Sequence, residues 1–279
     1  MLDTINNISN ELMIPGTPPA VFWAMISLGM ISQGIGKSGF AGGIGILCYP
    51  LMALVMKIEH VAAVMLPMLV LFDLNAIYHF RSQKDIKKVI SFFPFCILGI
   101  LIGGVFWVLI EEQGIAPYER SLKCMVGIIA IVFAIYILFK ETIFKNLQPF
   151  KPGFKSSLIT GILTGISSTL AHAAGPIVSM FMFVQGMNKS LFVGTVAWTF
   201  ALINISKIPI FAYAGLFTTV GLKITLILFP LVPIGSLMGK MLHDRINQKA
   251  FNWTLMICVF IAGIQLISGV NLILIISQY

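Results

Sequence analysis

The sequence has 279 residues, of which 58% are hydrophobic and only 10% are charged, and its mean hydropathy is +0.98. A soluble domain of this length carries about 25% charged residues, so the composition excludes one. Apolar runs of about 20 residues alternate with short polar loops and predict helices that cross a bilayer. The net charge of +8 lies mostly in those loops, where membrane orientation accounts for it, so we expect no nucleic-acid partner.

The first half of the chain contains five apolar segments. Residues 1–17 are predicted to be an extracytoplasmic N-terminal segment, and residues 18–140 a first membrane repeat. The predicted segments of this repeat are 19–34, 39–56, 61–80, 89–110 and 122–139.

The second half follows the same plan. Residues 141–155, with four lysines nearby and prolines that break regular structure, are predicted to be a cytoplasmic linker, and residues 156–279 a second membrane repeat. Its predicted segments are 157–168, 174–187, 191–213, 220–242 and 251–275.

Matching residues support an internal repeat. At an offset of 131 residues the pairs are Gly34 and Gly165, Asp73 and Asn204, Asn75 and Ser206, and Phe80 and Phe211. At an offset of 136 they are Pro94 and Pro230, Gly99 and Gly235, and Gly103 and Gly239. The glycines have the small-xxx-small spacing that lets helices pack closely in lipid. Five segments per half is an odd number, which predicts inverted repeats, a plan typical of transporters with a site at the membrane midplane.

Basic residues predict the orientation. Three loops, 81–88, 140–155 and 240–249, hold eleven of the eighteen Lys and Arg residues, so we place them in the cytoplasm and both termini outside the inner membrane. The opening segments of each repeat are short; residues 157–168 would form about 18 Å of helix against a hydrocarbon core of about 30 Å. We therefore expect the first two segments of each half to be short, broken or re-entrant.

The first such break, Gly34–Gly43, contains a lysine at membrane depth. A cation there is costly and indicates a functional role or a partner. We predict that Lys37, with Ser38, Gly39 and Gly42, binds an anion. The alternatives are that Lys37 extends to an interface or pairs with Asp73.

The second break, Gly165–Pro176, lies 131 residues after the first, and we expect the two to face each other in the bilayer and form one binding site. Ser168, Thr169, His172 and Gly175 are its candidate substrate-binding residues, because hydroxyls and a helix N-terminus donate hydrogen bonds to anions. Serine and threonine can instead bond to their own helix, and a lone histidine can be a satisfied buried residue.

Four further residues are candidates for coupling or charge balance: Asp73, Asn75, Asn204 and Lys207. Asp73 is the only carboxylate deep in a predicted helix. For Lys207 we expect a side chain that extends along its helix to the interface.

The four cysteines have no metal or redox spacing, and no His or carboxylate set predicts catalysis, so we expect no cofactor, no metal and no enzyme. A secondary anion transporter is favoured. An anion channel is the alternative, although it would need a continuous hydrophilic path, and a membrane-embedded enzyme is less favoured. A small anion, protons and the lipid bilayer are the expected partners, and a homodimer is compatible with the sequence.

Two motifs resemble a known family. Residues 34–40 resemble the membrane-turn motif of the sulfite exporter TauE/SafE family (toluenesulfonate uptake permease family), with Ser38 in place of a glycine. Residues 168–176 resemble its second motif, with Ala174 in place of a glycine. Residues 192–195 and the run to Pro209 also resemble the corresponding part of this family. The resemblance covers about residues 20–267. It implies an all-α inner-membrane transporter of sulfur-containing anions such as sulfite or organosulfonates, driven by the proton gradient.

Overall fold

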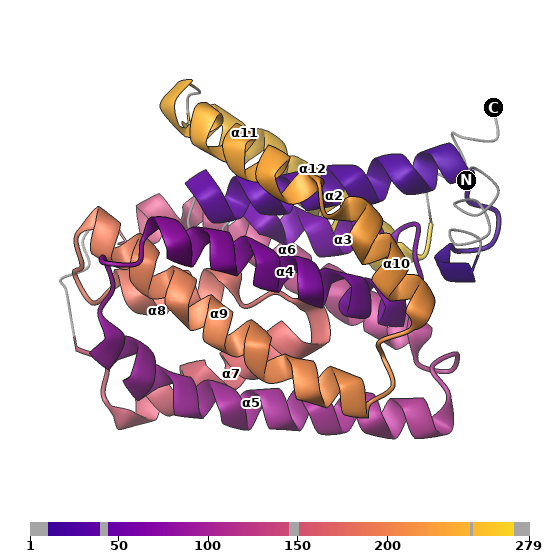
Figure 1. The fold of residues 1–279 in the computed structure, drawn as a ribbon, viewed down its shortest axis with the longest axis horizontal. Helices are drawn as coiled ribbons and strands as arrows, with labels where there is room; N and C mark the ends of the chain where they lie inside the picture. Colours follow the sequence, from indigo (N-terminus) through magenta and orange to yellow (C-terminus); the bar gives the residue numbers. More distant parts are fainter. Residues whose placement is uncertain (1–10, 40–43, 145–150, 246–247, 271–279) are drawn as a thin grey trace.

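The computed structural model describes residues 11–39, 44–144, 151–245 and 248–270, and within these ranges the secondary structure is helical (Figure 1). The first half contains α2 (Pro19–Gly39), the 3₁₀ turn η1 (Ile44–Leu47), α3 (Cys48–Ala53), α4 (Ile58–His79), α5 (Ile86–Gln113) and α6 (Glu119–Phe144). The second half contains α7 (Phe154–Ala171), α8 (Gly175–Phe183), α9 (Lys189–Tyr213), α10 (Thr219–Leu228), α11 (Leu231–Arg245) and α12 (Gln248–Ser268).

The prediction of a polytopic helical membrane protein is confirmed. Among the described residues, α2, α4, α5 and α9 are each long and apolar enough to cross a bilayer. The pair α10–α11, bent by 46°, is long and apolar enough to form a fifth span. Large apolar side chains remain exposed along α5, among them Leu98, Leu101, Val105 and Leu109, as expected of a helix that faces lipid.

Several predicted boundaries differ from the structure, and the last segment, predicted to reach residue 275, ends at Ser268. The first segment does not stop at Gly34 but continues to Gly39, because glycine costs a helix only about 1 kcal/mol. The segment predicted at 157–168 is the 18-residue α7, about 27 Å long. The segment predicted at 220–242 divides into two helices at Pro230, where the missing proline N–H interrupts the helix.

The second member of each opening pair is short, as predicted. Helix α3 has 6 residues and α8 has 9, so they extend about 9 Å and 14 Å. Neither crosses a hydrocarbon core of about 30 Å. Helix α3 is buried along most of its length, whereas α8 buries Pro176 and Val178 near its start and exposes Phe183 at its end.

The two halves pack against each other reciprocally. Helix α2 packs on α11, α7 on α5, α4 on α9 and α6 on α12, and in Figure 1 α4 and α9 lie between the α2–α11 and α5–α7 pairs. Glycines allow close approaches: Gly34 faces Gly235, and Gly165 faces Gly99. A Cβ atom would overlap neighbouring backbone at Gly34, Gly99 and Gly165 and would be tight at Gly235. The predicted packing role of the small-xxx-small glycines is therefore confirmed at Gly99 and Gly235.

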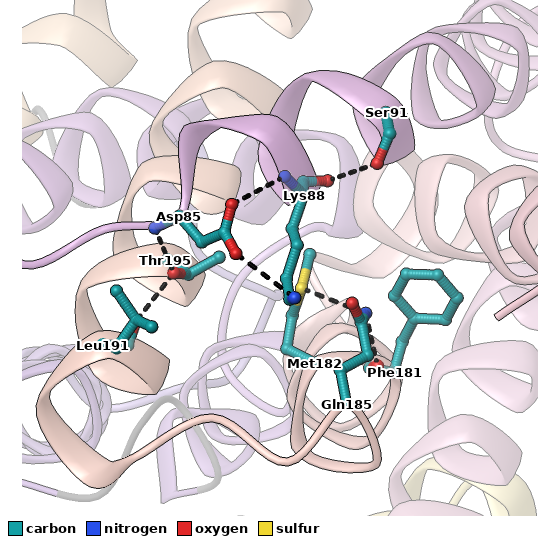
Figure 2. Close-up of polar contacts among 8 residues, drawn as sticks. All are labelled: Asp85, Lys88, Ser91, Phe181, Met182, Gln185, Leu191 and Thr195. Carbon is teal, nitrogen blue, oxygen red and sulfur yellow. Dashed lines mark hydrogen bonds and ion pairs between the residues drawn. The ribbon is translucent and has the colours of Figure 1, made fainter. Parts of the chain in front are cut away.

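The loop between α4 and α5 is attached to α9. The Asp85 N–H donates to Thr195 Oγ1 at 2.9 Å, and the Gln83 carbonyl lies against Gly194, where a side chain would overlap it. Figure 2 shows Asp85 at the start of α5, where its carboxylate accepts the Lys88 N–H at 3.2 Å and pairs with the Lys88 ammonium at 3.2 Å. These contacts attach the loop that follows α4 to the first turns of α9.

The described part of the N-terminal segment is packed onto the membrane region. Leu12 is fully buried, and its carbonyl accepts the Lys57 N–H at 3.1 Å. An isolated bridge joins Met13 to Met56. This segment therefore covers the end of α3.

Candidate functional site

A buried ion pair joins the first break to α4. Lys37 lies in the last turn of α2, and its ammonium donates to Asp73 Oδ1. Asn204 of α9 donates from Nδ2 to Asp73 Oδ2 at 2.6 Å. Both carboxylate oxygens of Asp73 therefore accept hydrogen bonds, one from each half of the chain. The alternative in which Lys37 pairs with Asp73 is therefore the arrangement found.

A second buried cation lies close by. Lys207 of α9 has no exposed surface, so the prediction that it extends to the interface is wrong. Its Nζ lies 3.1 Å from the Ser168 carbonyl, 3.0 Å from Ser168 Oγ and 2.9 Å from His172 Nδ1. The Ser168 carbonyl also accepts the His172 N–H at 3.1 Å, so Lys207 uses the second acceptor position of this oxygen.

His172 ends α7 in a left-handed conformation, with φ 48° and ψ 29°. Histidine is one of the few side chains enriched in this region, which costs most residues about 1–2 kcal/mol. Its Nε2 lies 2.9 Å from the Ala62 carbonyl and must carry a proton to bond with it. Its Nδ1 faces the Lys207 ammonium and therefore accepts, so the ring is neutral. The chain reversal at His172 thus places the ring between α4 and α9.

A small cavity lies between the ends of α2 and α7 and the start of α8. Its volume is about 20 Å³, enough for a water molecule, so an oxyanion of four or five heavy atoms would need the surrounding helices to move apart. Its lining residues are Gln33, Lys37, Gly45, Leu69, Ser168, His172, Ala174, Gly175, Phe200 and Asn204.

The cavity wall is rich in hydrogen-bond donors. Helix α8 begins at Gly175 next to the cavity, and its N-cap Ala174 provides no side-chain cap, so backbone N–H groups and the positive end of the helix dipole remain for a ligand. The Lys37 ammonium lies over the Phe200 ring, 4.3 Å from its centroid. Ammonium, hydroxyl and helix N-terminus together form an environment that suits an anion.

The structure brings most of the predicted site residues together. Lys37, Ser168, His172, Gly175 and Asn204 line the cavity, while Asp73 and Lys207 bond to these residues from behind.

Other predicted residues lie elsewhere. Thr169 packs against Gly103 of α5, and its hydroxyl donates to the Gly165 carbonyl of its own helix at 2.9 Å. Ser38 faces Gly239 on α11. Asn75 donates to Ser236 of α11 at 3.1 Å. Gly39 is the last residue of α2, and Gly42 lies outside the described residues.

Five lining residues were not predicted: Gln33, Gly45, Leu69, Ala174 and Phe200. Gln33 is buried one turn before Lys37, and Phe200 lies one turn before Asn204. The available signal was helical spacing, because residues four apart share a helix face. Gln33 is also an uncharged polar side chain inside an apolar segment.

The sequence profile of the family described as sulfite exporter TauE/SafE matches residues 25–266, a range that includes every residue of this cluster. The chain belongs to the TauE/SafE family. The resemblance seen at the two breaks is thereby confirmed, and membership makes the chain a membrane transport protein for sulfite or related anions. No curated protein and no solved structure matches the chain.

Proposed function

We propose that this TauE/SafE protein is a secondary transporter that moves a small sulfur-containing anion, such as sulfite or a sulfonate, across the cytoplasmic membrane by proton-coupled alternating access. The observation that carries the proposal is the cavity where the two breaks meet, lined by the Lys37 ammonium, the Ser168 hydroxyl and the N-terminus of α8. Donors fixed in a low-dielectric site can replace the hydration that an anion loses on binding.

We further propose that the halves are inverted repeats. The reciprocal packing supports this, because Gly34 and Gly165 correspond at an offset of 131 residues, and each contacts a glycine of the other half. Those partners, Gly235 and Gly99, correspond at an offset of 136. Alternating access would then occur by movement of one repeat relative to the other about the cavity.

Within this scheme the residues have separate roles. Lys37, Ser168 and the backbone at Gly175 donate to the substrate. His172, whose Nε2 bonds to Ala62 and whose Nδ1 bonds to Lys207, would relay a proton on leaving one of these partners. Asp73 is the coupling residue: while ionised it holds Lys37 beside the bound anion, and its protonation at another step of the cycle would break that bond. Asn204 holds the carboxylate in place from the second half.

An anion channel is the second candidate, and transport kinetics separate the two. The test is flux of sulfite into liposomes that contain the purified protein. A transporter predicts saturable flux that changes with an imposed pH gradient, and a loss of at least ten-fold for Ser168→Ala. The matched control is Ser91→Ala, an exposed serine on α5 that should leave flux unchanged. Flux that stays linear with concentration would favour the channel, and absence of anion flux would reject both.

A further inference from the structure

The charges around the cavity do not cancel. The charged side chains that line it, or that bond to lining residues, are Lys37, Asp73 and Lys207, and His172 is neutral. Both oxygens of Asp73 are engaged by Lys37 and Asn204. With Asp73 ionised and Lys207 protonated, the cluster has one net positive charge.

That charge belongs to Lys207. Among the described side chains, no carboxylate lies within ion-pairing distance of its Nζ, whose partners are the neutral oxygens of Ser168 and the ring of His172. A fully buried cation without a counter-ion is costly, and the cost falls when an anion approaches. We propose that the transported anion is the missing counter-ion of Lys207 and that the substrate is therefore a monoanion, of the sulfonate or hydrogensulfite type, rather than a dianion.

The charge reaches the cavity through two residues. Ser168 Oγ accepts a hydrogen bond from Lys207, which leaves the hydroxyl proton to donate into the cavity that Ser168 lines. An ammonium that bonds to the oxygen of a hydroxyl also makes that hydroxyl a stronger donor. His172 is fixed in the same way, since its Nδ1 accepts from Lys207 and its Nε2 donates to Ala62.

The single charge also explains how dianions would be rejected. A monoanion brings the buried cluster to neutrality, whereas a dianion leaves one negative charge uncompensated in a low-dielectric site. Charges about 6 Å apart at an effective dielectric constant of about 20 change an affinity by roughly a hundred-fold. The inference rests on the proposed anion site and adds the charge of its substrate.

The test compares methanesulfonate and sulfate, two tetrahedral anions of similar size that differ by one charge. Calorimetric titration of the purified full-length chain at neutral pH measures Kd for both. We expect methanesulfonate to bind at least ten-fold more tightly than sulfate. Lys207→Met should weaken methanesulfonate binding ten- to a hundred-fold, while Lys223→Met, which removes an exposed lysine of α10, should leave Kd unchanged.

A second variant tests the charge count independently of whether Lys207→Met folds. Asp73→Asn raises the net charge of the cluster to two, so the affinity for sulfate relative to methanesulfonate should rise at least ten-fold. An unchanged ratio, or sulfate bound as tightly as methanesulfonate by the wild-type protein, would overturn the inference and leave the anion site standing. Wild-type protein that binds neither anion would instead contradict the proposed function.

Discussion

Asp73 is the residue at which the two halves of the site meet. It accepts one hydrogen bond from Lys37 of the first half and one from Asn204 of the second. Asn204 is also its counterpart at an offset of 131 residues, so corresponding positions on α4 and α9 contact each other. Movement of either half would therefore change a hydrogen bond of this one carboxylate.

Removal of this carboxylate alone should lower the stability of the fold more than removal of the whole ion pair. Asp73→Asn leaves the Lys37 ammonium buried without its counter-ion, which costs about 3–5 kcal/mol in comparable buried pairs. The double variant Lys37→Met/Asp73→Asn removes the stranded charge and should recover part of the loss. Thermal unfolding in detergent measures all three proteins. A double variant less stable than Asp73→Asn would show that the unpaired Lys37 charge is not what destabilises Asp73→Asn.

Some of the residue-scale result follows from sequence alone, and some does not. A lysine and an aspartate inside apolar segments predict each other as partners, because each charge is costly by itself. Lys207 was placed wrongly, since its position in the chain allows either an inward or an outward side chain, and only the acceptors at the end of α7 decide between them. Ser38 and Thr169 show the same limit: both belong to the motifs, but both face glycines of neighbouring helices.

At the scale of elements, α5 begins at Asp85. Burial raises the pKa of Asp85, but hydrogen bonds from Lys88 and the Lys87 N–H, together with the Lys88 charge, outweigh it and hold the pKa below its ordinary value. A lowered pKa means that the carboxylate stabilises the folded state above the unfolded value of about 3.9 and loses that effect as the pH falls through the folded value.

Asp85→Ala should therefore destabilise the protein at pH 7 by about 1 kcal/mol, the usual cost of a lost helix cap. The difference from wild type should shrink in acid below about pH 4. Thermal unfolding at a series of pH values checks this. A difference that is the same in acid and at pH 7 would mean that the charge of Asp85 contributes nothing.

The contact between α5 and α7 depends on glycine. A Cβ atom at Gly99 would overlap the Ile162 carbonyl and the backbone of Gly165. Gly99→Ala should lower stability by about 1–3 kcal/mol, because overpacking forces the backbones apart. The control is Gly153→Ala, where a Cβ meets open space, and it should unfold as the wild type does. Equal midpoints for the two variants would contradict the close packing.

Element positions were predictable where the signal is local. The apolar runs predicted α4, α5 and α9 to within a few residues, because length and hydropathy decide a membrane span. The continuation of α2 through Gly34 was not predictable, because the tolerance of that glycine comes from Gly235 on a distant helix. The bend between α10 and α11 was missed, although Pro230 marks it.

At the scale of the whole molecule, the orientation of the chain in the membrane can be tested by cysteine labelling. Ser82 and Gln113 are exposed at opposite ends of α5. In cells, with the native cysteines replaced, we expect Gln113→Cys to react with a membrane-impermeant maleimide from outside and Ser82→Cys to react only after permeabilisation. The reverse pattern would invert the assignment made from the basic loops.

The central claim is that an anion binds where the two breaks meet, and the position of a heavy analogue tests it most directly. Selenite resembles sulfite, and its selenium can be located by anomalous diffraction from crystals of the protein. We predict one selenium peak in the cavity, within hydrogen-bonding range of the Ser168 hydroxyl and the first N–H groups of α8. A peak only at the surface hollow near Ser82 and Asn188, with none between the breaks, would contradict the account.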